Sequence, residues 1–203
     1  APVSILRRPF RSLAFRVIAF STLWAMVALV VIATIISTLF RQASERGFES
    51  LLTAHLFNLI GSVDVSDDGG LQGAPNLGDL RFNVPRSGWY WTVEPVSDTV
   101  SGELASLSLT EEVPSPSTEQ VPFDAEFQRS YVTDGLAGET IEVFETEFVL
   151  GGDNRVARFR LMGNRSELEA DISAFEHRLY LSLLIFGVGT IAINAMAILI
   201  GLG

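Results

Sequence analysis

The chain has no cysteine, no lysine and only two histidines among its 203 residues. The absence of cysteine excludes disulfide bonds, a thiolate nucleophile and a cysteine-based metal site. All fourteen basic residues are Arg and the formal net charge is -10, so the chain offers no basic surface to nucleic acid. No nucleophile, base and orienting group stand at a recognisable spacing, so the residues predict no catalytic site.

Two long runs, Val17–Phe40 and Leu179–Gly203, lack every charged side chain. Each is long enough to cross a hydrocarbon core of about 30 Å at about 1.5 Å per residue. We therefore predict transmembrane helices at 17–40 and 179–203. A cleaved signal peptide is the alternative for the first run, but this run is longer than the usual apolar region and no small-residue cleavage site follows it.

Charge is distributed unevenly around these runs. The stretch Ala1–Arg16 has four Arg and no acidic residue, whereas 41–178 holds all 24 acidic residues and ten Arg, a net charge of -14. Basic flanks stay on the cytoplasmic side of a membrane. Residues 1–16 are therefore predicted to be a cytoplasmic tail, and 41–178 to be a domain on the outer side.

The outer segment begins and ends with helical patterns. Apolar residues at helical spacing over Gln42–Val63 predict that the first membrane helix continues outward. Asn164 as N-cap, with Glu167 three residues later, predicts a last helix that runs into the second span without a break. Between them lie a turn-rich stretch at 64–79, a loop at 110–122 and five strand candidates. These candidates are the aromatic end of Arg81–Val93 after a turn at Pro85–Gly88, then Glu103–Leu109, Glu126–Thr133, Thr140–Leu150 and Arg155–Met162.

The last two strand candidates form the clearest pattern. Glu residues alternate with apolar residues over Thr140–Leu150, Arg residues do so over Arg155–Met162, and the turn sequence Gly151–Asn154 lies between them. This predicts a hairpin with cross-strand Glu–Arg pairs. The fold class is therefore α+β: a central antiparallel sheet with long N- and C-terminal helices, flanked by two transmembrane helices.

Two segments carry a family resemblance. RFNVPRSGWYWTVEP at 81–95 and ARFRLMGNRSELEADISAF at 157–175 resemble segments of bacterial membrane-bound sensor histidine kinases of two-component systems, especially those of alphaproteobacteria. The order of tail, span, outer domain and span resembles these proteins too. The resemblance implies a PAS-like periplasmic sensor domain at 41–178, an inner-membrane location and a homodimer.

The resemblance also implies a cytoplasmic half, with HAMP, dimerisation and ATP-binding domains, that uses ATP and Mg²⁺ to phosphorylate a response regulator. None of its motifs occurs in these 203 residues, and both His55 and His177 lie in the outer segment. We therefore expect no kinase activity and no cofactor in this chain alone. Input halves of chemoreceptors or cyclic-dinucleotide enzymes share the layout, and a non-signalling envelope adaptor is the alternative from another class.

Several residues are candidates for ligand contacts. Arg81 and Arg86 suit an anionic ligand, and Trp89, Tyr90 and Trp91 suit the wall of a pocket; ion pairing and core packing are the alternatives. Some sensors that the chain resembles bind divalent cations on an acidic surface, and oxygen ligands suit Ca²⁺ or Mg²⁺. A solvated acidic surface is the alternative here. The acidic candidates are Glu94, Asp98, Glu103, Glu111, Glu112 and Glu119, with Asp124 and Glu126 beside them.

Three further polar residues stand near or within apolar segments. His55 and His177 are candidates for pH sensing, because histidine titrates between pH 5 and 8. Asn194 lies in the second span, where a buried amide seeks a partner on another helix. It is predicted to make a contact between the chains of a dimer, with a contact inside one chain as the alternative.

Overall fold

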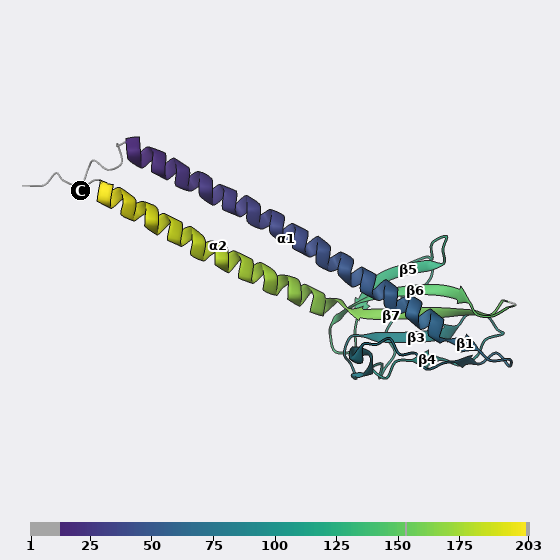
Figure 1. The fold of residues 1–203 in the computed structure, drawn as a ribbon. Helices are drawn as coiled ribbons and strands as arrows, with labels where there is room; N and C mark the ends of the chain where they lie inside the picture. Colours follow the sequence, from purple (N-terminus) through teal and green to yellow (C-terminus); the bar gives the residue numbers. More distant parts are fainter. Residues whose placement is uncertain (1–12, 153, 202–203) are drawn as a thin grey trace, which may run out of the picture. The chain divides into compact units, whose positions relative to one another are not determined.

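The computed structural model describes residues 13–152 and 154–201. Most of the predicted basic tail and the last two residues of the predicted second span lie outside these ranges. The described chain divides into two compact units. The helical unit combines helix α1 up to Ala43 with helix α2 from Asp171, and the sheet unit covers Ser44–Ala170. The elements are α1 (Leu13–Ser62), β1 (Asp64–Val65), β2 (Leu71–Gln72), the 3₁₀ helix η2 (Leu80–Asn83), β3 (Tyr90–Pro95), β4 (Leu104–Ala105), β5 (Gln128–Asp134), β6 (Thr140–Val149), β7 (Val156–Asn164) and α2 (Arg165–Gly201) (Figure 1).

Both helices of the helical unit are long and apolar enough to cross a membrane. Their most apolar windows are only 11% and 6% buried, whereas the core helix of a soluble protein buries most of its side chains. Each helix also continues without interruption beyond its apolar run, as the sequence predicts. Near residue 40 the rings of Phe40 and Phe175 stack at 3.8 Å, and the Ser37 hydroxyl donates to Glu176 at 3.0 Å.

The sheet unit is built on five strands in the order β4-β3-β7-β6-β5, with every neighbouring pair antiparallel (Figure 1). The predicted hairpin is confirmed, since β6 pairs with β7 across Gly151–Asn154, of which residue 153 is not described. The predicted charge pairs also form: Glu145 lies opposite Arg160, and Glu147 opposite Arg158. The α+β class with an antiparallel sheet is therefore confirmed.

One face of the sheet is covered by the part of α1 that belongs to the sheet unit. Its buried side chains are Phe48, Leu52, His55, Leu56 and Leu59, at helical spacing. The ring of Phe48 meets Trp89 edge-on at 5.7 Å. A Cβ at Gly163 of β7 would lie 2.5 Å from the Leu52 side chain, so glycine allows the helix to approach the sheet closely at this point.

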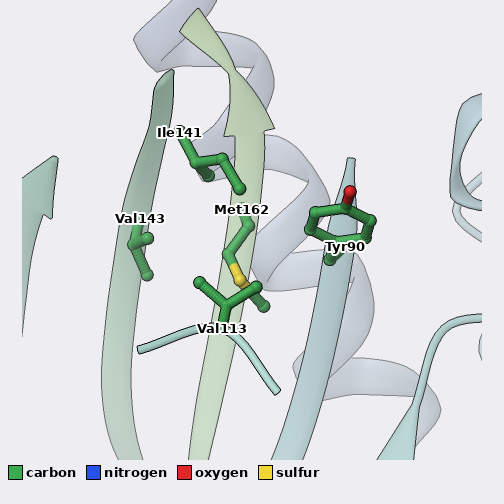
Figure 2. Packing of buried hydrophobic residues seen from close by; sticks show 5 residues of the cluster. All are labelled: Tyr90, Val113, Ile141, Val143 and Met162. Carbon is green, nitrogen blue, oxygen red and sulfur yellow. The ribbon is translucent and has the colours of Figure 1, made fainter. Parts of the chain in front are cut away.

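The opposite face of the sheet holds a second apolar cluster. Tyr90, Ile141, Val143 and Met162 rise from β3, β6 and β7, and Val113 from the segment after β4 packs onto them (Figure 2). All five side chains are at most 3% exposed. The segment predicted as an exposed loop at 110–122 is therefore anchored to the sheet through Val113.

Some predicted elements differ from the observed ones. The strand predicted within Arg81–Val93 begins only at Tyr90, because Leu80–Asn83 forms η2, which Asp79 caps by accepting from the Arg81 N–H. The turn-rich stretch at 64–79 contains the small β1–β2 pair.

The strand predicted at Glu103–Leu109 was also too long, since only Leu104 and Ala105, the two residues of β4, pair with β3 in the sheet. Beyond them, the Ser106 hydroxyl accepts from the Trp91 N–H and the Ser108 hydroxyl donates to the Trp89 carbonyl. The Ser106 N–H also donates to the Trp91 carbonyl at 2.9 Å, so side-chain and backbone bonds together continue the contact along the edge of β3.

Candidate functional site

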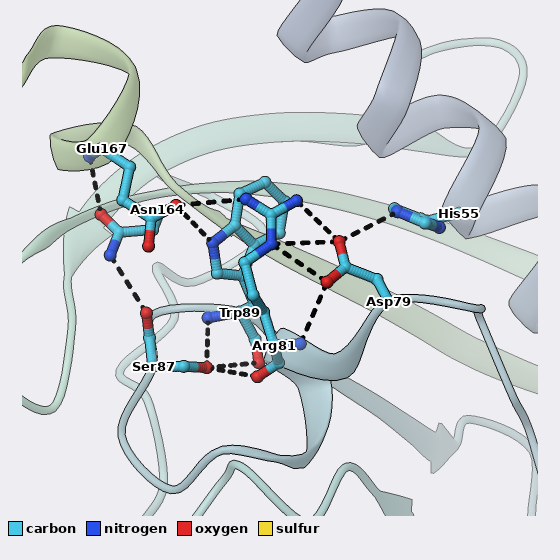
Figure 3. Close-up of polar contacts among 7 residues, drawn as sticks. All are labelled: His55, Asp79, Arg81, Ser87, Trp89, Asn164 and Glu167. Atoms are coloured by element: carbon cyan, nitrogen blue, oxygen red, sulfur yellow. Dashed lines mark hydrogen bonds and ion pairs between the residues drawn. The ribbon is translucent and has the colours of Figure 1, made fainter. Parts of the chain in front are cut away.

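Arg81 of η2 contacts the first turn of α2 and the turn before β3 (Figure 3). Its Nε and Nη2 donate to the Asp79 carboxylate at 2.6–3.1 Å, and its Nη1 donates to Glu167 in the first turn of α2 at 3.2 Å. Its guanidinium carbon lies 3.8 Å from the ring centroid of Trp89, a cation–π distance. Two carboxylates and an aromatic ring therefore already bind the Arg81 guanidinium. This corresponds to ion pairing, the alternative to binding an anionic ligand.

The turn before β3 completes this network. The Trp89 indole donates to Glu167 at 3.0 Å, and the Ser87 hydroxyl donates to the Arg81 carbonyl at 2.6 Å. Asn164 donates to the Ser87 carbonyl at 3.1 Å and accepts from the Glu167 N–H at 3.2 Å, so the predicted N-cap is confirmed. The Glu167 side chain binds Trp89 and Arg81. The turn at Ser87–Trp89 and the start of α2 are thus tied to η2.

His55 of α1 lies beside this network. Its Nε2 is buried, 3.8 Å from the Asp79 carboxylate, and has no hydrogen-bond partner among the described residues. Its ring meets Phe82 edge-on at 5.4 Å. Burial lowers the pKa of His55, and the Asp79 charge opposes that shift. The hydrogen bonds from Arg81 lower the pKa of Asp79.

We call His55, Asp79, Arg81, Trp89 and Glu167 the bracket. It contains residues of α1 and of α2, and all of them belong to the sheet unit. The sequence singled out Arg81, Trp89 and His55, but it did not show that Asp79 and Glu167 are their partners. The Asx pattern two residues before Arg81 was the only local signal for Asp79.

The other candidate ligand residues lie in different surroundings. Trp89, Tyr90 and Trp91 are all at most 7% exposed, and Trp89 and Tyr90 pack on opposite faces of the sheet. Arg86 donates to the Leu136 carbonyl and lies 3.7 Å from Glu111. In this conformation the three aromatic side chains belong to the hydrophobic core. Ligand binding by these residues stays a prediction.

A buried charge cluster lies on the sheet face that carries Met162. Glu145 is fully buried and accepts from Arg129 at 2.6 Å, from Arg160 at 2.7 Å and from the Tyr131 hydroxyl. Burial alone would raise the pKa of Glu145, but these bonds and the charge of Arg160 lower it. Burial and the bond to Glu145 raise the pKa of Tyr131. The sequence predicted Glu–Arg pairs across these strands, but it gave neither the pairing of Glu145 with Arg160 nor its burial.

The acidic candidates are divided among several places. Four of them, Glu94, Glu103, Glu111 and Glu112, line one pocket of about 340 Å³ on the same sheet face. Asp124 and Glu126 line a groove of about 430 Å³ between α1 and strands β5 and β6, and Asp98 and Glu119 are exposed in loops. In the described part of the chain, no group of three or more His, Asp or Glu side chains is placed to hold a metal ion.

Asn194 has a partner in the same chain. Its amide donates to the Thr22 hydroxyl at 2.5 Å, within the helical unit. This is the alternative to a contact between chains, and the dimer contact stays a prediction. The predicted pH sensing by His55 and His177 likewise stays a prediction.

Comparison of the chain with protein-family models, curated protein sequences and solved structures returned no match.

Proposed function

We propose that this chain is the signal-input part of a bacterial sensor histidine kinase. In this proposal the apolar parts of α1 and α2 cross the inner membrane, and the acidic sheet unit is a PAS-like sensor in the periplasm. The observation that carries the proposal is that two largely unburied apolar helices each continue without a break into one α+β unit. A cleaved signal sequence would not explain the second of them.

The bracket supports a route for the signal. It connects His55 of α1 with Glu167 of α2 through Asp79 and Arg81, so residues of both helices belong to one network. A stimulus that favours one packing of this network over another shifts the population of the two packings. Because each helix is continuous, a displacement at its outer part is transmitted along its length.

The remaining parts of the proposal concern the parent protein. There the input module forms a homodimer, with Asn194 as a candidate contact between chains, and cytoplasmic domains use ATP and Mg²⁺ to phosphorylate a response regulator. Support for this part comes from the resemblance of the segments at 81–95 and 157–175 to segments of sensor histidine kinases. These two segments contact each other through the bracket, because Arg81 and Trp89 of the first bind Glu167 of the second.

Thiol labelling tests the topology. Because the chain has no cysteine, a single introduced cysteine is the only thiol. Ser115→Cys lies in an exposed part of the sheet unit and should react with a membrane-impermeant maleimide in intact cells with a permeabilised outer membrane. Ser4→Cys in the basic tail is the control and should react only after lysis. Labelling of Ser115→Cys only after lysis would overturn the proposed orientation.

A fusion tests the transmission. Residues 1–203 are joined to the cytoplasmic half of a sensor kinase with a known reporter, and Glu167→Gln is compared with Glu49→Gln. Glu167 accepts from Trp89 and Arg81, whereas Glu49 is exposed on α1. We expect Glu167→Gln to change the reporter output at equal protein abundance and Glu49→Gln to leave it unchanged. Equal output from both variants would contradict a role of the bracket in signalling.

A further inference from the structure

The pocket beside the Val113 cluster combines features of a small-molecule site. Its volume of about 340 Å³ lies within the usual range for such sites, roughly 300–1,000 Å³. Its walls come from β3, β4, β7 and the segment that ends in Val113. Apolar side chains, among them Leu109, Val113 and Met162, line one part of it, and carboxylates line another.

Two of the four carboxylates have no basic partner in the described part of the chain. Glu94 lies 3.5 Å from Arg160, and Glu111 lies 3.7 Å from Arg86. No ion pair joins Glu103 or Glu112 to a described Arg, and both are exposed. Arg160 itself is bound by Glu145 at 2.7 Å. The pocket therefore keeps an excess of negative charge, which favours a cation.

A buried hydroxyl gives an independent sign of a ligand. Thr92 lines the pocket, is only 8% exposed, and its Oγ1 has no hydrogen-bond partner among the described residues. In the strand register Thr92 lies between Arg160 and Ala105, on the face that bears the pocket. Buried polar atoms without a partner are rare and call for an explanation. A ligand atom in the pocket would supply the missing bond after a small shift of the covering side chains.

The arrangement favours an organic cation over a metal ion. The carboxylates stand on three separate segments around the rim, and no three of them are placed to hold a metal. An alkylammonium ligand can place its charge near Glu103 and Glu112, its hydrocarbon chain on Val113 and Met162, and a polar end near Thr92. We propose that this pocket binds a small organic cation with one or more ammonium groups and a short apolar chain.

The pocket also adjoins a segment that such a ligand would hold against the sheet. Val113 is 3% exposed and packs on Tyr90 and Met162, so the segment that carries Glu111 and Glu112 is anchored beside β3 and β7 (Figure 2). A ligand that bridges this segment and Thr92 stabilises their contact. Its role as a stimulus rests on the proposed sensory function, whereas its binding does not.

Calorimetric titration of the full 203-residue chain in detergent micelles tests the binding. The probes are 1,4-diaminobutane and butylammonium, with 1-butanol, butyrate and MgCl₂ as neutral, anionic and metal-ion comparisons. We expect saturable binding of the two cations and none of the first two comparisons. Absence of diamine binding at millimolar concentration would overturn the proposal, as would Mg²⁺ binding that displaces the diamine at equal concentration.

Matched variants locate the binding. Glu103→Gln with Glu112→Gln should weaken diamine binding about tenfold, equivalent to about 1.4 kcal/mol, and Thr92→Val should weaken it severalfold. Asp98→Asn with Glu119→Gln removes the same charge from exposed residues that do not line the pocket, and should leave affinity unchanged. An equal loss in this control pair would show diffuse charge screening and refute the site. Unchanged affinity in Thr92→Val would refute the role of the hydroxyl.

The kinase fusion separates this inference from the proposed function. Diamine binding without any change of reporter output would leave the site standing and refute its sensory role. Failure of the thiol-labelling test would refute the membrane arrangement, whatever the calorimetry shows. A fusion that responds to other compounds while the diamine and butylammonium do not bind would refute the site alone.

Discussion

Replacement of Glu145 by Gln tests the buried charge cluster most directly. Oε2 of Glu145 accepts from Arg129 Nε at 2.6 Å, and Oε1 accepts from Arg160 Nε at 2.7 Å and from Tyr131. Gln keeps the shape but has one oxygen and one NH₂ group. In either orientation the NH₂ group faces an Arg N–H, so one donor is set against another and two Arg lose their buried counter-charge.

Loss of one partner from a buried ion pair costs about 3–5 kcal/mol of unfolding free energy. Arg129 keeps hydrogen bonds to three carbonyls and Arg160 keeps Glu94, so we expect the lower end, about 3 kcal/mol. Glu147→Gln is the matched control. Glu147 pairs with Arg158 at 2.8 Å, but both side chains are partly exposed, so its loss should cost only about 1 kcal/mol.

Urea unfolding of the sheet unit measures both variants. The chain is held in detergent, and Trp24→Phe in every variant leaves the fluorescence of Trp89 and Trp91, which are buried in this unit. Because the pKa of Glu145 is lowered, its contribution is complete above about pH 4.3 and is lost only as the pH falls through the lower folded-state value. The difference should therefore persist at about pH 5. A difference between the two variants below about 0.5 kcal/mol would refute the reasoning.

Three further predictions use the same unfolding assay. Gly163→Ala should destabilise the sheet unit by about 1–3 kcal/mol, because the new methyl would lie 2.5 Å from Leu52. The control Gly47→Ala lies in open space on α1 and should stabilise the unit by about 0.5–1 kcal/mol. Equal effects of the two substitutions would contradict the packing. Because burial lowers the pKa of His55, the unfolded chain binds more protons, so wild-type stability should fall as pH drops below about 6.5. His55→Gln should flatten that fall, and an unchanged slope would disprove it. Thr92→Val should raise stability by about 1 kcal/mol, since an unpartnered buried hydroxyl is removed; a loss of similar size would show that the hydroxyl is satisfied.

Local patterns in the sequence were sufficient for the elements that depend on near neighbours. The hairpin at Gly151–Asn154 follows from alternation and turn residues, and the cap at Asn164 follows from its spacing to Glu167. The two apolar helices follow from length and the absence of charge, because a helix satisfies its own backbone hydrogen bonds. These features need no knowledge of which elements lie side by side.

Tertiary structure decided everything that depends on distant partners. The sequence placed Glu167 in a capping box, yet its side chain binds Trp89 and Arg81, which lie 78 and 86 residues away. Glu–Arg pairing across the hairpin follows from the alternation, but the buried cluster of Glu145 with Arg160 also needs Arg129 of the neighbouring strand β5. The unpartnered hydroxyl of Thr92 likewise results from strand register, which one residue of slip would reverse. Charge and hydropathy patterns therefore defined the two apolar helices and the strands of the hairpin. Only the packing of separate strands and helices determined which polar groups found partners and which described groups, such as the Thr92 hydroxyl, did not.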